Sequence, residues 1–265
     1  MTDMVSSKPT KYKSNRILER RDRILRVARK MLAESGAEEL SVRELCKRAG
    51  IAQKTLYNAF GSKDHVITLA VQQYTSKFTS SVVYKFPQDT LDGQIERLIK
   101  IHSRNTQLRA YTTAIMSVYN SPHSDRELRN TVREMSIRSY GPFIEFLAAE
   151  KALRPGVEVD HILASLTTST YSNLTDWCIG DIADDKLVER VCEGFLMIIS
   201  SSTDGDPQKM AVRWLSDLRE AEPSWRMFRR MAEVEPGELQ AALRESHSSD
   251  GAAAPATDSL ASTVE

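Results

Sequence analysis

The 265-residue sequence has only three cysteines and no arrangement of them that indicates a metal site. Cys46, Cys178 and Cys192 form no Cys-x-x-Cys pair, and the five histidines are scattered along the chain. All three cysteines fall in helical patterns, where a cysteine is typically a small buried apolar residue. We therefore expect no metal and no cofactor, with a thiol sensor as the alternative interpretation of these cysteines.

The usual signatures of an enzyme are also missing. The sequence has no Gly-rich phosphate loop, no His-Glu-x-x-His motif, and no His, Cys or carboxylate pairs at catalytic spacing. We predict that the protein has no catalytic residues and is not an enzyme. The N-terminus has no apolar signal core, and no apolar run approaches about 20 residues, so we expect a cytoplasmic protein without a membrane partner.

Alternating strand patterns are absent, and apolar residues recur at helical spacing between connectors that contain glycine or proline. We therefore predict an all-α fold. Helices are expected at Leu91–Ser103, Gln107–Tyr119, Ser124–Leu153, Val159–Ile179, Asp185–Ser200, Gln208–Glu220 and Ser224–Val234. Gly141-Pro142 should kink or split the third of these, because proline has no N–H to donate.

Charge is unevenly distributed, although the whole chain is neutral. Residues 1–65 contain 15 Lys and Arg against 8 Asp and Glu, a net charge of +7. The remaining residues contain 21 against 28, a net charge of −7. A basic N-terminal segment followed by an acidic one favours a polyanionic partner for the first segment alone.

Residues Ser41–Phe60 contain two short helical patterns joined by a tight turn. Ser41 can cap the first helix, and Glu44 occupies the third helical position, as in a capping box. Gly50 then supplies the positive φ that a sharp turn between helices requires. This arrangement predicts a helix-turn-helix.

The second helical pattern, Ala52–Phe60, places Leu56 and Phe60 on one face and polar side chains elsewhere. The polar side chains belong to Gln53, Lys54, Thr55, Tyr57 and Asn58. Such a set suits hydrogen bonds to base edges and phosphates in a major groove, which is about the width of one helix. A helical hairpin with a solvated polar face is the alternative interpretation.

The flanking segments make the pattern more specific. An amphipathic helix is expected at Arg16–Glu34, and another helix should begin after Ser62. Together these features resemble the DNA-binding domain of the TetR family of bacterial transcriptional regulators, over about Arg16–Ile67. The resemblance rests on Gly36, Ser41-Val42, Ala49-Gly50-Ile51, Thr55-Leu56-Tyr57, Phe60 and Ser62-Lys63, whereas Cys46, Ala52 and Asn58-Ala59 depart from the usual residues.

The resemblance implies a homodimer whose three-helix heads bind a palindromic operator in double-stranded DNA. It further implies a repressor that a small hydrophobic effector releases from the operator. Base-edge contacts are expected from Gln53, Lys54, Thr55 and Asn58, and phosphate contacts from Ser41, Arg43, Tyr57 and Lys63. A TetR-like architectural protein or adaptor without a small-molecule ligand is the alternative.

The expected organisation has five parts. They are a flexible basic arm at 1–15, the helix-turn-helix domain at 16–65, a helical effector-binding and dimerisation domain at 66–203, a helical extension at 204–245, and a disordered tail at 246–265. The extension should either pack over the effector domain or lengthen the dimer contact. The apolar run Val191–Ile199 and the small residues Thr167–Thr170 are the candidates for the dimer interface.

An effector pocket should be mostly apolar with a few polar groups. Seven residues on the middle helices fit that description: His102, Tyr111, Met116, Tyr119, Phe143, Tyr171 and Trp177. Ordinary core packing is the alternative for each of them.

Overall fold

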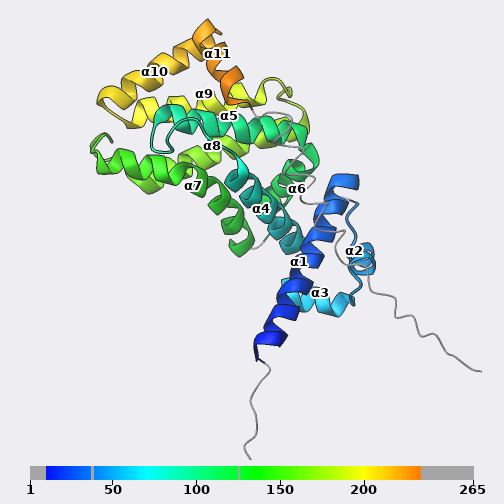
Figure 1. Ribbon diagram of the computed structural model, residues 1–265. Coiled ribbons are helices and arrows are strands. Elements are labelled where there is room, and N and C mark those ends of the chain that lie inside the picture. Colours follow the sequence, from blue (N-terminus) through cyan, green and yellow to red (C-terminus); the bar gives the residue numbers. More distant parts are fainter. Residues whose placement is uncertain (1–9, 37–38, 125, 234–265) are drawn as a thin grey trace, which may run out of the picture. The chain divides into compact units, whose positions relative to one another are not determined.

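The computed structural model describes residues 10–36, 39–124 and 126–233, which form eleven α-helices and no named β-strand (Figure 1). The N-terminal helices are α1 (Thr10–Ser35), α2 (Val42–Ala49), α3 (Gln53–Phe60) and α4 (Lys63–Ser81). The middle helices are α5 (Leu91–Gln107), α6 (Arg109–Asn120), α7 (Arg126–Ala149), α8 (Val159–Ile179) and α9 (Leu187–Ser202). The last two are α10 (Gly205–Arg219) and α11 (Pro223–Ala232). The all-α prediction is confirmed.

Three sequence-based expectations need correction. Helix α1 begins at Thr10, so residues 10–15 of the expected flexible arm are helical. Helix α10 begins at Gly205, three residues before the expected start at Gln208, because Asp204 already has the extended backbone of an N-cap. Of the two outcomes expected at Gly141-Pro142, a kink or a split, the split is wrong, because α7 runs unbroken from Arg126 to Ala149. Proline there forfeits one N–H bond, whereas the buried residues around it keep the helix packed. The expected tail at 246–265 lies outside the described residues.

The head, which we define as α1–α3, is built on the apolar stripe of α1. Five residues of this stripe are buried: Ile24, Leu25, Ala28, Met31 and Leu32. Helix α1 contacts α2 within the head and also contacts α4 and α6. The same helix therefore belongs to two packing interfaces.

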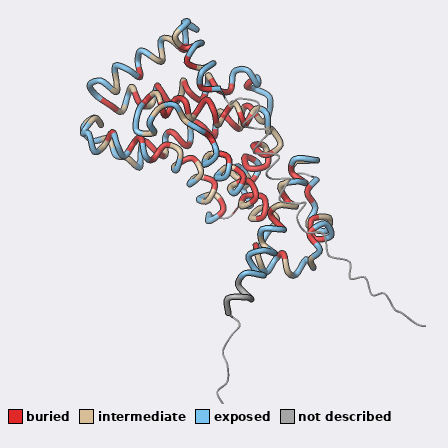
Figure 2. The backbone as a smooth tube through the Cα atoms, in the orientation of Figure 1, coloured by how far each residue is buried: buried red, intermediate tan, exposed pale blue. Residues whose placement is uncertain are grey.

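The body, which we define as α4–α9, has its core between α5, α7, α8 and α9. Figure 2 shows buried residues on the facing sides of these helices and exposed residues on their outer sides. The rings of Tyr140 and Phe143 lie 5.9 and 6.0 Å from that of Phe195, which joins α7 to α9. Helices α8 and α9 approach so closely that a Cβ on Gly194 would lie 2.5 Å from Ser169 Oγ.

The connection between α4 and α5 is held by a buried carboxylate. Glu96 is fully buried and accepts hydrogen bonds from the backbone N–H groups of Lys85 and Phe86 at 2.9–3.0 Å. Hydrogen bonds from N–H groups to a charged acceptor are stronger than those between neutral groups. Glu96 therefore ties this connection to α5.

Helices α10 and α11 pack against α9 and α5, so the first of the two expected roles for the extension is the one observed. Trp214 of α10 donates from Nε1 to Asp92 Oδ1 of α5 at 2.8 Å. Phe228 of α11 lies 4.9 Å from the ring of Trp214 and 5.4 Å from that of Phe86. None of the helices in the described ranges is long and apolar enough to cross a membrane.

Gly93 offers a direct test of the packing at the start of α5. A Cβ there would lie 1.8 Å from the carbonyl oxygen of Pro87, so Gly93→Ala should lower the free energy of unfolding by about 2 kcal/mol or more. Gly141→Ala is the matched control, since its Cβ would meet only Glu145 Oε1 at 3.9 Å and should raise stability by about 0.5–1 kcal/mol. Urea unfolding of both variants measures the difference, and equal stabilities would contradict the described packing.

Candidate nucleic-acid interface and body cavity

Local hydrogen bonds fix the turn between α2 and α3. The N–H of Glu44 donates to Ser41 Oγ at 3.1 Å, which caps α2 as expected. Gly50 has φ +62° and donates to the Lys47 carbonyl, while Ile51 donates to the Cys46 carbonyl at 3.0 Å. Only glycine adopts this left-handed conformation without strain, so Gly50 sets the direction in which α3 leaves the turn.

The capping box is only half formed. The Glu44 carboxylate accepts from Arg48 Nε at 2.9 Å, and this hydrogen bond lowers the pKa of Glu44. Arg48 also pairs with Glu34 of α1. The carboxylate thus links α2 to α1 through Arg48.

Helix α3 is held by its buried face and by one arginine of α1. Leu56 and Phe60 are buried, and the Arg21 guanidinium lies 4.5 Å from the centre of the Phe60 ring. Arg21 also donates from Nη1 to the Ala59 carbonyl at 2.8 Å. The sequence interpretation missed this anchor because its partner is 38 residues away and gives no local signal.

The eight predicted DNA-contacting residues all reach the surface of the head. Six are exposed, namely Ser41, Arg43, Gln53, Lys54, Tyr57 and Asn58, and the other two, Thr55 and Lys63, are half-buried. The Tyr57 ring is 47% exposed, so its hydroxyl is open to a partner at the surface of the head. Ala52 makes no side-chain cap at the start of α3, so the first N–H groups of α3 have no side-chain acceptor from their N-cap residue.

The body contains a cavity of about 370 Å³ bordered by α4, α5, α6, α7 and α8. Four of the seven predicted pocket residues line it: His102, Tyr111, Met116 and Tyr171. The other three lie elsewhere. Tyr119 packs edge-on against Tyr171 at 4.8 Å, and Phe143 packs against Phe195.

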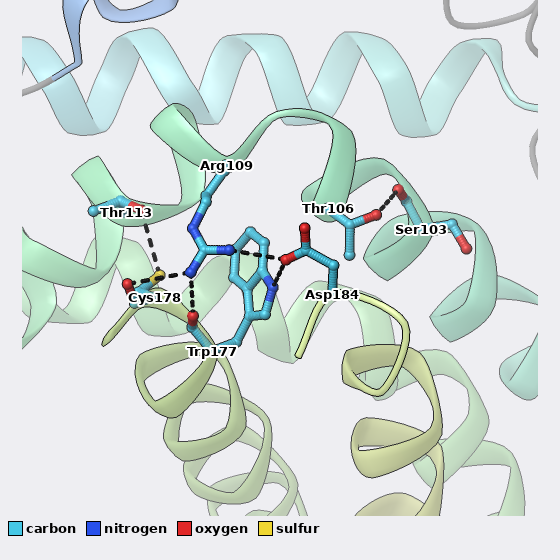
Figure 3. Close-up of polar contacts among 7 residues, drawn as sticks. All are labelled: Ser103, Thr106, Arg109, Thr113, Trp177, Cys178 and Asp184. Carbon is cyan, nitrogen blue, oxygen red and sulfur yellow. Dashed lines mark hydrogen bonds and ion pairs between the residues drawn. The ribbon is translucent and has the colours of Figure 1, made fainter. Parts of the chain in front are cut away.

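Trp177 is the third predicted pocket residue that lies outside the cavity, and it belongs to a cluster of structural contacts (Figure 3). Its Nε1–H donates to Asp184 Oδ1 at 2.7 Å, and the Arg109 guanidinium lies 4.5 Å from its ring centre. Arg109 also pairs with Asp184 at 2.8 Å and donates to the Trp177 carbonyl at 2.6 Å. These contacts join the start of α6 to the end of α8. The Trp177 indole was predicted to line the effector pocket, but it takes part in these structural contacts instead.

Three neighbouring residues on α5 form a polar network in the cavity wall. Arg104 can only donate, so the Asn105 oxygen faces its Nη2 at 3.4 Å. The Asn105 amide N–H therefore donates to His102 Nδ1 at 3.2 Å, which places the imidazole proton on Nε2. Burial, with a smaller effect of Arg104, lowers the pKa of His102 from 6.5 to about 3, so the ring is neutral.

The cysteines lack the features of a reactive thiol. Burial raises the pKa of Cys192 to about 12 and also raises the pKa values of Cys46 and Cys178. Within the described ranges, no three His, Cys, Asp or Glu side chains gather where they could hold a metal ion.

Comparison with known proteins identifies the head. A family model described as bacterial regulatory proteins of the tetR family matches residues 24–68, which include the whole of α2 and α3. Residues 24–68 are therefore similar to the DNA-binding domain of the TetR family, as the sequence predicted. The HTH-type transcriptional repressor KstR2 of Mycolicibacterium smegmatis is 24% identical over 163 residues, which cover 57% of this chain and 76% of that protein.

Solved structures show that the TetR-type fold extends beyond the head. The TetR regulator TylP of Streptomyces fradiae has a TM-score of 0.51 and 18% identity, and the match covers 78% of this chain and 98% of that one. A TetR transcriptional regulator from Rhodococcus sp. RHA1 has a TM-score of 0.51 and 19% identity, with 70% and 97% covered.

His102 should make the stability of this protein depend on pH. Its folded-state pKa of about 3 lies below the unfolded value of 6.5, so between these values the unfolded chain binds a proton that the folded chain does not. The contribution is complete above pH 6.5 and is lost as the pH falls toward 3. His102→Gln should therefore flatten the decline in unfolding free energy between about pH 7 and about pH 4.5. His161→Gln on the exposed start of α8 is the control, and an unchanged slope in His102→Gln would contradict the described burial.

Proposed function

We propose that this protein is a transcriptional repressor that binds a palindromic operator as a homodimer and leaves it when an effector enters the body cavity. The observation that carries the proposal is a hydrogen bond from the cavity wall to the DNA-binding head. Tyr111 lines the cavity, and its hydroxyl donates to the Arg29 carbonyl of α1 at 2.8 Å. The name of the relative KstR2, a repressor, supports the direction of regulation.

The exposed side chains of α3 are suited to read base edges. Gln53, Lys54, Thr55 and Asn58 offer amide, ammonium and hydroxyl groups, and a good bidentate pair discriminates between bases by about 1–3 kcal/mol. Ser41, Arg43, Tyr57 and Lys63 flank them and are suited to phosphates, which fix position without specifying sequence. Charge supports this role, because the head is basic and the remainder of the chain is acidic.

The homodimer is proposed to form through α8 and α9. Small exposed residues follow one face of α8 at Ser165, Thr168 and Ser172, and α9 presents Met197 at 48% exposure beside the half-buried Ile198. Small side chains allow helices of two copies to approach closely, and an exposed apolar residue favours burial in a partner. Such a dimer would present two copies of α3 to successive major grooves.

Effector release is proposed to act through α4 and α6, which both border the cavity and contact α1. The rings of Tyr74 on α4 and Tyr111 on α6 lie 5.2 Å apart, and Arg29 of α1 donates to Gln73 of α4 at 2.8 Å. A ligand that displaces either helix therefore changes the support of α1. The presence of a cavity favours a ligand-responsive regulator over an architectural protein without a ligand.

Selection from a random DNA pool at near-physiological salt tests the function directly. We expect an inverted repeat with half-site centres about 10.5 base pairs apart, or a multiple of that spacing. Asn58→Ala should relax the base preference at one position of the operator and lower the binding free energy by about 1–3 kcal/mol. Arg43→Ala should weaken binding to all DNA sequences alike, and it should reduce the slope of log affinity against log salt concentration by about one. Lys209→Ala, an exposed change on α10, is the control. A pool without any enriched sequence would refute operator binding.

Tyr111→Phe tests the link between cavity and head. It removes the hydrogen bond to Arg29 and keeps the ring, so it should reduce the effector's influence on operator affinity, where a coupling of about 5- to 150-fold is typical. Operator affinity is measured by fluorescence anisotropy, with and without the compound that raises the melting temperature most in a survey of hydrophobic ligands. Tyr119→Phe, outside the cavity, is the control. Equal coupling in both variants and the wild type would exclude Tyr111 as the link.

A further inference from the structure

The charges on the cavity wall are all of one sign. Three arginines, Arg97, Arg104 and Arg138, are among the lining residues, and no described aspartate or glutamate is. Apolar residues line the same cavity, including Leu98, Ile115, Met116 and Leu174. Arg138 pairs with Glu134 at 3.6 Å on the outer side of α7, whereas no such ion pair is described for Arg97 or Arg104.

Arg104 is the most deeply buried of the three, with 4% of its surface exposed. Its guanidinium lies 4.3 Å from the centre of the Phe78 ring and 5.2 Å from that of Tyr74. Its Nη2 donates a long hydrogen bond to Asn105 Oδ1 at 3.4 Å, and its Nε and Nη1 have no hydrogen-bond acceptor among the described residues. No carboxylate in the described ranges forms an ion pair with it.

Arg109, five residues further along the chain, shows what a structural arginine looks like in this protein. It stacks on Trp177, pairs with Asp184 and donates to a carbonyl, so both a counter-ion and acceptors are present (Figure 3). Arg104 has the ring contacts and lacks the counter-ion. A buried cation without a carboxylate lowers stability, and such a cost is typical of residues kept for binding.

The neighbours of Arg104 cannot supply the missing negative charge. Asn105 uses its oxygen on Arg104 already, and His102 is neutral with its proton on Nε2. Glu96 lies on the same helix, but its two oxygens accept from the backbone of Lys85 and Phe86, and Lys100 Nζ lies 3.8 Å away. No described residue therefore supplies the charge that would balance Arg104.

We propose that the effector is an anionic amphiphile, whose carboxylate or phosphate group pairs with Arg104 while its apolar part occupies the rest of the cavity. This proposal shares one assumption with the proposed function, namely that the cavity is the effector site. Arg97 lies two helical turns from Arg104 on α5, with its guanidinium 3.8 Å from the centre of the Tyr84 ring. It offers a second cation to a ligand with a larger or more highly charged head group.

Calorimetric titration with matched pairs of probes tests the charge preference. The pairs are decanoate with decanamide and naphthalene-2-carboxylate with naphthalene-2-carboxamide, and decyl phosphate distinguishes a phosphate preference from a carboxylate preference. We expect each acid to bind about tenfold or more tightly than its amide, as for hydrogen bonds to a charged group. Arg104→Gln should abolish the difference, and Arg213→Gln, which removes one exposed positive charge from α10, should preserve it.

Stability of the unliganded protein supplies a second measurement that needs no probe. Arg104→Met should leave the melting temperature unchanged or raise it, because it removes a buried charge without a counter-ion. Arg109→Met should lower the melting temperature, because it removes the ion pair with Asp184 and the hydrogen bond to the Trp177 carbonyl. A fall in Arg104→Met as large as that in Arg109→Met would assign Arg104 a structural role and overturn the proposal.

The remaining outcomes separate this proposal from the proposed function. Three results would overturn the proposal of an anionic effector. They are equal binding of acid and amide, a preference for the acid that persists in Arg104→Gln, and no binding of any probe. Acid-selective binding that depends on Arg104 but leaves operator affinity unchanged would support the anion site and refute regulation through the cavity.

Discussion

The packing of α1 is the constraint on which the rest of the structure depends. A head of about fifty residues buries little surface and gains little stability by itself, and its central helix is shared with the body. Ala28 and Met31 are buried on one face of α1, while the Arg29 carbonyl accepts from Tyr111 of α6 and the Arg29 side chain donates to Gln73 of α4. Because one helix belongs to both interfaces, a shift in α4 or α6 changes the contacts that orient the head.

The parts of the fold that the sequence predicts correctly are those with local causes. Ser41, Gly50 and Ser62 act on atoms within five residues of themselves, so their effect on helix ends can be read without knowing the tertiary structure. The same holds for the exposed polar face of α3, which follows from helical periodicity once Leu56 and Phe60 are taken as buried. The residues proposed to contact DNA were therefore accessible to sequence reasoning.

The cavity was less predictable because its chemistry depends on distant partners. Phe143 and Trp177 were predicted to line the pocket because they are large and aromatic. Large aromatic rings are equally common in hydrophobic cores, and both residues are buried in the core here. Arg104 lies in a polar stretch of sequence that resembles a solvated helix face. Its burial arises from rings on α4, about 26–30 residues earlier in the chain, and only the folded structure brings them together.

The clamp that Glu96 forms has a mechanical consequence. It fixes the end of α4 that meets the body, and α11 adds to the restraint where Lys85 Nζ donates to the Met231 carbonyl at 2.7 Å. Helix α4 has 19 residues, which corresponds to a rod of about 28 Å. A rod fixed at one end moves most at the other, so a small sideways push by a bound molecule would be amplified at the end of α4 that supports the head.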